Sequence, residues 1–221
     1  MLVFIFTVAG ACGIVSSSHG LIATPEAAQQ TDAIPDAEAQ KGTETAVFAG
    51  GCFWGVEGVF EHVKGVRNVS SGYAGGTARS ANYDSVSSGR TDHAESVRVT
   101  YDPAQVTYEK LLEIFFTVAH DPTEVNRQGP DVGRHYRSAI FYANDEQKEL
   151  ATRYIASINE SKTLTKPVAT EVVALTKFFD AESYHQDFMK KNPNQAYIVQ
   201  HDKPKLEELK GKFPELYVKK W

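Results

Sequence analysis

Segments with strand character and segments with helix character alternate along this chain from residue 45 onward, and some strands follow one another without a helix between them. A helix after every strand would favour a parallel, doubly wound sheet, whereas adjoining strands also require antiparallel pairs. The sequence therefore predicts an α/β protein, a two-layer α/β sandwich with a mixed sheet and a ferredoxin-like core. No glycine-rich phosphate loop follows a strand, which argues against a nucleotide cofactor.

Hydrophobic spacing gives the expected bounds of the elements. Alternation of apolar and polar residues, or a short apolar run, predicts strands at residues 46–49, 66–73, 96–101, 138–142 and 170–175. Apolar residues at helical spacing predict helices at residues 53–63, 107–119, 145–158 and 203–209. Thr107 is the expected N-cap of the second of these helices.

The first 44 residues have a different composition from the rest. Residues 1–23 contain an apolar run followed by small residues and resemble a secretory signal peptide, although no Lys or Arg precedes the run. Residues 24–44 contain no aromatic residue and carry five acidic residues against one Lys, so we expect a disordered linker. We expect export, to the periplasm in a bacterium, with the cytoplasm as the alternative. Membrane attachment is expected only if Cys12 carries a lipid.

Charge and cysteine content exclude several classes of protein. The 23 Lys and Arg residues against 28 Asp and Glu residues give a net charge of −5, which provides no electrostatic footprint for nucleic acid. The two cysteines cannot build a disulfide framework or a zinc site. His93, His120 and His135 do not show the spacing of metal ligands, so no metal is expected.

Cys52 lies between the strand expected at 46–49 and the helix expected from residue 53, in the segment Gly50-Gly51-Cys52-Phe53-Trp54-Gly55. A cysteine at a helix N-terminus experiences the positive end of the helix dipole and free N–H groups, which favour its thiolate. The glycines allow other groups to approach the backbone closely. The neighbouring aromatic residues indicate an apolar pocket. The alternative is a buried, inert cysteine in a glycine-rich turn.

This segment resembles the active-site motif of the A-type peptide methionine sulfoxide reductases. The resemblance covers residues 45–217 in order, through Gly72–Gly76, Asn82–Val86, Ser88–Glu95, Tyr101–Pro103, His120–Thr123, Asn126–Gly133, Tyr136–Ile140 and Ala181–Gln186. Many members also carry resolving cysteines near the C-terminus. Here Ile198 stands at the first such position and no cysteine follows, so the chain resembles a one-cysteine variant.

The resemblance implies an enzyme that repairs oxidised proteins by reducing the S epimer of methionine sulfoxide, free or protein-bound. Cys52 matches the family's nucleophile and Glu95 its acid, which requires the site to raise the pKa of this carboxyl above that of free Glu. The other matched residues are Tyr83 and Tyr136 as hydroxyl donors to the sulfoxide oxygen, Phe53 and Trp54 as the apolar cradle of the substrate methyl, and Asp131 as a residue that positions substrate or orders the site.

The resemblance implies no cofactor. An external thiol, such as thioredoxin, glutaredoxin or glutathione, would reduce the sulfenic acid left on Cys52. His135 stands where the family commonly has Gln, and His185 is expected to be structural. We expect a monomer. Two alternative functions stay open, a cysteine hydrolase or acyltransferase that pairs Cys52 with a histidine, and a catalytically silent exported module for redox sensing or binding.

Overall fold

The computed structural model describes Leu2 and residues 42–221. The predicted signal peptide with Cys12 and the predicted linker as far as residue 41 lie outside the described residues, apart from Leu2. Glu44, which we expected in the linker, is instead the first residue of strand β1 (Glu44–Gly50). Its backbone pairs with that of Tyr101, whose hydroxyl donates to the Glu44 carboxylate at 2.7 Å. The folded region therefore begins slightly earlier than the sequence indicated.

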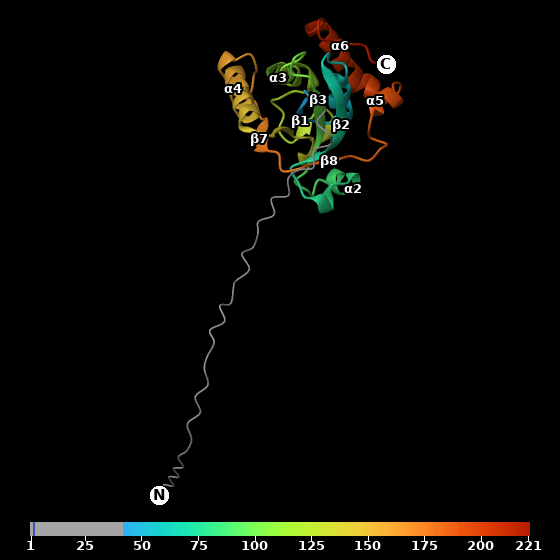
Figure 1. The fold of residues 1–221 in the computed structure, drawn as a ribbon. Coiled ribbons are helices and arrows are strands. Elements are labelled where there is room, and N and C mark those ends of the chain that lie inside the picture. The colour runs from blue at the N-terminus through green and yellow to red at the C-terminus, as the bar shows by residue number, and fades with distance from the viewer. Residues whose placement is uncertain (1, 3–41) are drawn as a thin grey trace, which may run out of the picture. The chain divides into compact units, whose positions relative to one another are not determined.

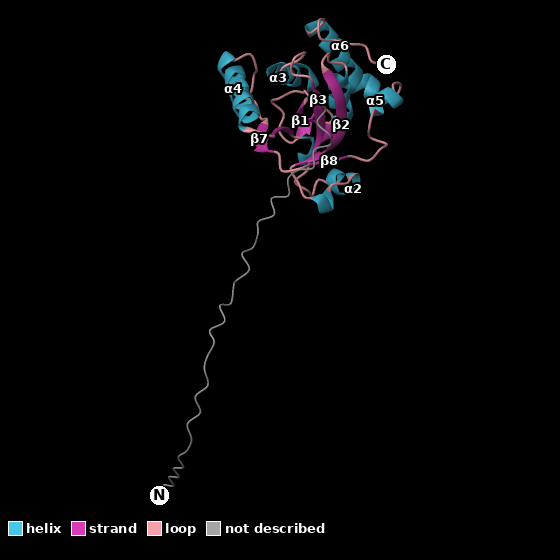
Figure 2. Cartoon of the chain, in the orientation of Figure 1, coloured by secondary structure: helices cyan, strands magenta, loops and turns pink. Residues whose placement is uncertain are grey.

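Six strands form one sheet in the order β7-β6-β1-β3-β2-β8 (Figures 1 and 2). In chain order after β1 they are β2 (Val66–Ala74), β3 (Ala94–Tyr101), β6 (Ser138–Tyr142), β7 (Glu171–Ala174) and β8 (Phe178–Asp180). The β6–β7 pair is parallel and the other neighbours are antiparallel, which confirms the predicted mixed sheet. Two further strands, β4 (Arg127–Gln128) and β5 (Asp131–Val132), form a separate hairpin.

The central strands have the predicted ferredoxin-like connectivity. Helix α1 (Phe53–Glu61) joins β1 to β2, β3 follows β2 in sequence, and α3 (Tyr108–Ile114) lies between β3 and β6. With the spatial order β6-β1-β3-β2, this is the βαββαβ arrangement of ferredoxin-like folds. The α/β fold predicted from the alternation of strands and helices is confirmed.

The core explains why the helices cover one face of this sheet. Successive residues of a strand point to opposite faces, so Phe48 joins the large buried cluster, whereas Val47 and Ala49 join a smaller one. The buried apolar residues of α1 and α3 belong to the large cluster, and the smaller cluster contains strand residues. Phe48 stacks on Phe60 and Phe115, with ring centroids 5.2 and 4.9 Å apart. Two layers therefore enclose the main core.

Two of the remaining helices, α4 (Asp145–Ser161) and α6 (Lys203–Lys212), extend slightly beyond their predicted C-terminal ends. The short helices α2 (Tyr83–Ser87) and α5 (Phe188–Lys191) were not predicted, and the segments η2 (Phe115–Ala119) and η4 (Ile198–Asp202) are π-helical. Thr107 caps α3, as predicted, by accepting a hydrogen bond from the backbone N–H of Lys110 at 3.3 Å. None of the described helices combines the length and the apolar character needed to cross a membrane.

Candidate active site

Strand β1 leads through a tight glycine turn into α1, as the sequence predicted, and Cys52 is the N-cap residue of this helix. Gly51 has φ +91°, a conformation that favours glycine. A Cβ atom at Gly51 would lie 2.5 Å from Cβ of Gln128, whose side-chain amide is hydrogen-bonded to both the backbone N–H and the C=O of Asp121. The second glycine of the motif is therefore required by its backbone angle and by the close packing of the loop that contains β4.

The structure corrects the expected ionisation of Cys52. The side chain is buried, with 9% of the residue exposed. Burial raises the pKa of the thiol well above its ordinary value, and the charges of Glu95 and Asp202 raise it further. The hydrogen bond from the backbone N–H of Trp54 lowers this pKa. The helix N-terminus thus acts in the predicted direction, but burial and nearby carboxylates outweigh it. The resting nucleophile is a neutral thiol.

Glu95 lies near the start of β3, on the face of the sheet that the helices cover. Its carboxylate accepts a hydrogen bond from the backbone N–H of Phe53 at 3.1 Å, which places it at the first turn of α1 beside Cys52. The residue is 2% exposed. Burial raises its pKa from the ordinary 4.5 to about 8, against the lowering effect of the Phe53 N–H. The predicted elevation of this pKa is confirmed, so Glu95 is mostly protonated at neutral pH.

Two tyrosines lie near the same pair. Tyr83 is the first residue of α2, and its backbone N–H donates to Glu182 at 2.9 Å. Tyr136 ends the short helical turn η3 (Arg134–Tyr136). Burial raises the pKa of both phenols, and the charges of Glu95 and Cys52 raise both further, so the two tyrosines lie within electrostatic range of the thiol and the acid. Both remain neutral hydroxyl donors.

An aromatic group surrounds the turn that follows Cys52. Trp54, which is partly exposed, stacks on Phe188 with ring centroids 3.7 Å apart and donates its indole N–H to Nδ1 of His185 at 3.1 Å. Phe53 is 1% exposed and packs against His185 and Tyr73 at centroid distances of 4.9 and 5.9 Å. The indole therefore offers the accessible apolar surface, whereas the Phe53 ring is enclosed.

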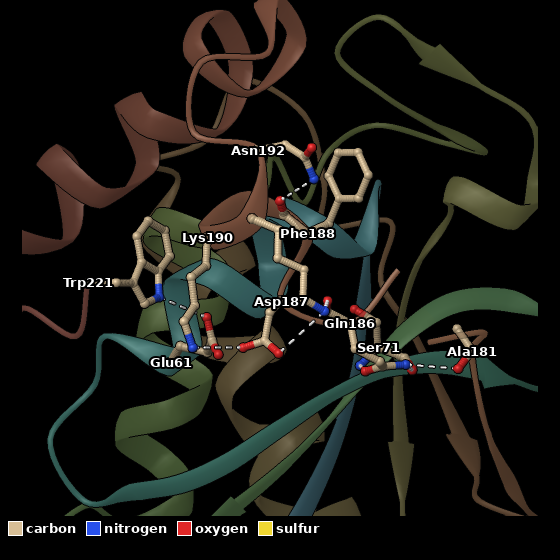
Figure 3. A network of polar contacts seen from close by, with 10 residues as sticks. Glu61, Ser71, Ala181, Gln186, Asp187, Phe188, Lys190, Asn192 and Trp221 are labelled. Atoms are coloured by element: carbon tan, nitrogen blue, oxygen red, sulfur yellow. Dashed lines mark hydrogen bonds and ion pairs between the residues drawn. The ribbon is translucent and has the colours of Figure 1, made fainter. Parts of the chain in front are cut away.

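A polar network fixes the segment that supports these rings (Figure 3). The Gln186 side chain accepts from the Ser71 N–H at 2.9 Å and donates to the Ser71 carbonyl oxygen at 2.8 Å, which joins the segment to β2. The Asn192 amide donates to the carbonyl oxygen of Phe188 at 3.0 Å. Because Gln186 lies between His185 and Phe188 in sequence, its bonds to the sheet restrain both partners of Trp54.

Asp131 lies on the β4–β5 hairpin and faces the same site. It accepts a hydrogen bond from the hydroxyl of Tyr197, which also packs edge-on against Trp54 at 6.1 Å. The charge of Asp131 raises the pKa values of Cys52, Glu95 and Tyr136. Asp131 thus lies within electrostatic range of the thiol, the acid and one hydroxyl donor, as expected of a residue that orders the site.

The histidines have separate partners in the structure. Both ring nitrogens of His120 are hydrogen-bonded, to the Phe115 carbonyl oxygen and to Ser138 Oγ. His93 bonds to the Thr77 carbonyl oxygen, and His135 packs on the Tyr136 ring at 4.1 Å. Over the described residues, no group of three potential ligands is arranged to hold a metal ion. The charges that act most strongly on the Cys52 thiol come from Glu95 and Asp202.

Four residues of the site were not identified as such from the sequence. Tyr197 and Asp202 come from the C-terminal region, where the sequence predicted a helix at residues 203–209 and showed no resolving cysteine. Glu182 accepts hydrogen bonds from the Tyr73 hydroxyl and the Tyr83 N–H, and His185 contacts the Trp54, Phe53 and Tyr83 rings. His185, expected to be structural, thus orients the aromatic group. The segment Ala181–Gln186 carried the only usable sequence signal, since it belongs to the ordered set of motifs.

Comparison with known proteins gives a consistent result. A family model described as "Peptide methionine sulfoxide reductase" matches residues 44–216. The chain is 54% identical over 182 residues to "Peptide methionine sulfoxide reductase MsrA 2" of Synechocystis sp., covering 82% of this chain and 85% of that protein. It is 53% identical over 185 residues to a protein of the same name from Mesorhizobium japonicum, covering 84% and 95%.

Solved structures agree with the sequence relatives. The reduced form of Mxr1 from Saccharomyces cerevisiae aligns with a TM-score of 0.64 and 31% identity, covering 70% of this chain and 88% of that chain. Methionine sulfoxide reductase A of Corynebacterium diphtheriae aligns with a TM-score of 0.61 and 37% identity, covering 70% and 77%. Sequence and fold thus point to the same set of proteins.

Proposed function

The chain belongs to the peptide methionine sulfoxide reductase family, and we propose that it performs the reaction of this family with Cys52 as nucleophile and Glu95 as proton donor. It is an oxidoreductase that reduces methionine sulfoxide to methionine. One observation carries the assignment of roles. A thiol and a carboxylic acid with a pKa of about 8 are buried together at the first turn of α1.

The proposed reaction balances without a cofactor. The sulfur of Cys52 forms a bond to the sulfoxide sulfur, the protons of the thiol and of Glu95 pass to the sulfoxide oxygen, and the S–O bond of the substrate breaks to release water. A water molecule then attacks the Cys52 sulfur, the bond between the two sulfurs breaks to release methionine, Cys52 is left as a sulfenic acid, and the proton that the attacking water loses returns to Glu95. The substrate sulfur is reduced by two electrons and the cysteine sulfur is oxidised by two. Because both groups are protonated at rest, the site holds the required protons before substrate binds.

The other groups support a polar side and an apolar side of the bound sulfoxide. In this proposal Tyr83 and Tyr136 donate to the oxygen together with Glu95, while Trp54, supported by Phe53, accommodates the methyl group. Asp131 and Tyr197 orient the substrate from the β4–β5 hairpin and the C-terminal region. Donors aimed at the oxygen stabilise the charge that develops on it as the S–O bond breaks.

This division predicts stereoselectivity. Exchanging oxygen and methyl at the sulfur would place the oxygen against aromatic rings without a hydrogen bond, which costs several kcal/mol on transfer scales. We expect the purified enzyme with a dithiol to consume only the S epimer of racemic dabsyl-methionine sulfoxide. Chromatographic separation of the epimers after exhaustive reaction measures this directly. Disappearance of both epimers would contradict the proposed geometry, and no turnover would favour the silent redox-sensing module.

Regeneration of the enzyme is the second testable part of the proposal. The only other cysteine is Cys12, in the segment that we propose to be removed or lipidated on export, so no intramolecular disulfide can resolve the sulfenic acid. An external thiol would then attack Cys52 and pass through a mixed disulfide. A thioredoxin-like protein is our first candidate, with glutaredoxin or glutathione as alternatives.

Intact mass spectrometry after one turnover without reductant tests this scheme. We expect one equivalent of methionine per enzyme and a single gain of about 16 Da at Cys52, corresponding to a sulfenic acid. A loss of about 2 Da from the full-length chain would instead show a Cys12–Cys52 disulfide, and the one-cysteine scheme would be wrong. The mass of the protein recovered from its own cells also gives its mature N-terminus, which tests the proposed export.

A further inference from the structure

Asp202 is a buried carboxylate that the proposed reaction does not use. The residue is 1% exposed, and its Oδ1 atom lies 3.3 Å from Nζ of Lys205. Its Oδ2 atom is buried and has no hydrogen-bond partner in the described part of the chain. Burying an ionised carboxylate is unfavourable unless it is paired and hydrogen-bonded. A buried carboxylate with only one of its two oxygen atoms paired therefore costs free energy of folding.

The position of Asp202 relative to α1 connects it to the nucleophile. A Cβ atom at Gly55 would lie 2.1 Å from Asp202 Oδ1 and 2.8 Å from Lys205 Nζ, so the absence of a side chain there admits the ion pair. Gly55 lies in the first turn of α1, and Cys52 is the N-cap residue of that turn. The Asp202 carboxylate therefore packs against the turn that begins at the thiol.

We propose that Asp202 is a positioning residue for the thiol of Cys52, and that its buried charge, partly balanced by Lys205, sets how much of Cys52 is ionised before substrate binds. A negative charge beside the sulfur disfavours the thiolate, and the ammonium of Lys205 opposes this effect. A neutral thiol is a poor nucleophile towards oxidants in solution. The charge of Asp202 would thus keep the reactive sulfur neutral until the sulfoxide arrives. This inference goes beyond the proposed function, because it concerns the thiol without substrate.

Other titratable groups also face Cys52 from several parts of the chain. They are Glu95 on β3, Asp131 on the β4–β5 hairpin, Tyr83 on α2, Tyr136 on η3 and Tyr197 in the C-terminal region. The pKa of Glu95 is raised to about 8, so its charge is largely absent at neutral pH. The tyrosines are neutral there as well. Burial raises the pKa of Asp202 above 3.8, but Lys205 opposes this. Among the carboxylates other than Glu95, Asp202 has the larger effect on the thiol and Asp131 a smaller one, and both disfavour the thiolate.

The test measures alkylation of Cys52 by iodoacetamide as a function of pH, in the full chain with Cys12→Ser so that Cys52 is the only thiol. Asp202→Asn keeps the side-chain shape and removes the charge, so its alkylation midpoint should move to lower pH. Below both midpoints the rate should rise by about tenfold for each pH unit of that shift. Lys205→Met should move the midpoint in the opposite direction and slow alkylation.

Glu207→Gln provides the matched control, because it also removes one negative charge from the C-terminal region, but from an exposed position on α6. Its alkylation profile should coincide with that of the parent. The proposal is overturned if Asp202→Asn folds and its profile also coincides with the parent's. If Asp202→Asn does not fold, an unchanged profile for Lys205→Met overturns it equally. Alkylation does not depend on sulfoxide reduction, so the proposed function can fail without affecting this result.

Discussion

Replacing Cys52 by serine is expected to abolish reduction of methionine sulfoxide. The attacking atom must be a soft, ionisable sulfur, and a serine hydroxyl is neither appreciably ionised nor soft. Cys52 is also the N-cap residue of α1, a position where serine is among the preferred residues. The Cys52→Ser variant should therefore keep its fold, and the loss should appear in the rate of methionine formation while the thermal unfolding transition is retained.

Cys12→Ser is the matched control for this experiment. It removes the other cysteine of the chain, outside the region that the family model matches, and should leave turnover by the purified protein unchanged. Measuring both variants with the same dithiol separates loss of the nucleophile from loss of a resolving thiol. Full activity in Cys52→Ser would remove the proposed chemistry altogether, because no other cysteine remains in residues 42–221.

The parts of the fold that could be predicted are those with a local signal. The strand–turn–helix around Cys52 follows from an apolar run, a pair of glycines and apolar residues at helical spacing, all within a few positions. Strand β8 was missed because three residues, Phe178–Asp180, are too few to show a period. The strand is defined instead by its pairing with β2, from Gly72↔Asp180 to Ala74↔Phe178. Such long-range pairing leaves no local pattern.

The difference between local and long-range signals also explains why the ionisation of Cys52 was predicted wrongly. The effect of a helix N-terminus can be inferred from the neighbouring sequence, and the Trp54 N–H does lower the pKa of the thiol. The opposing effects come from burial and from Glu95 and Asp202, which are remote in sequence and reach Cys52 only through the packing of β3 and η4 against α1. For Glu95 the family resemblance supplied the position of the acid, and the requirement for a proton donor supplied the direction of its pKa shift, which the structure confirms.

Glu95→Gln should reduce the rate of the sulfoxide reduction step by about 10² to 10⁴, the range typical for removal of a general acid. The amide keeps the shape of the side chain and can still accept the hydrogen bond from the Phe53 N–H, but it cannot give up a proton. Single-turnover formation of methionine, measured from about pH 5 to about pH 9, isolates this step from regeneration by thiols. Tyr83 and Tyr136 remain in place as hydroxyl donors and account for residual activity.

The pH dependence distinguishes proton donation from a merely structural role. Glu95 has its pKa raised from 4.5 to about 8, so its acid form predominates at neutral pH and is lost as the pH rises through about 8. The parent should therefore lose the contribution of the acid above that pH, and Glu95→Gln should not show this decline. The pKa of Glu95 is higher in the folded protein, at about 8, than the ordinary value of 4.5 that applies to the unfolded chain. The free energy of unfolding of the parent therefore falls as the pH rises between these two values, and Glu95→Gln lacks this contribution. A variant that reacts at the parent's rate over the whole range would exclude Glu95 as the acid. A slower variant with the parent's decline near pH 8 would show that Glu95 acts through the position of the Phe53 turn instead.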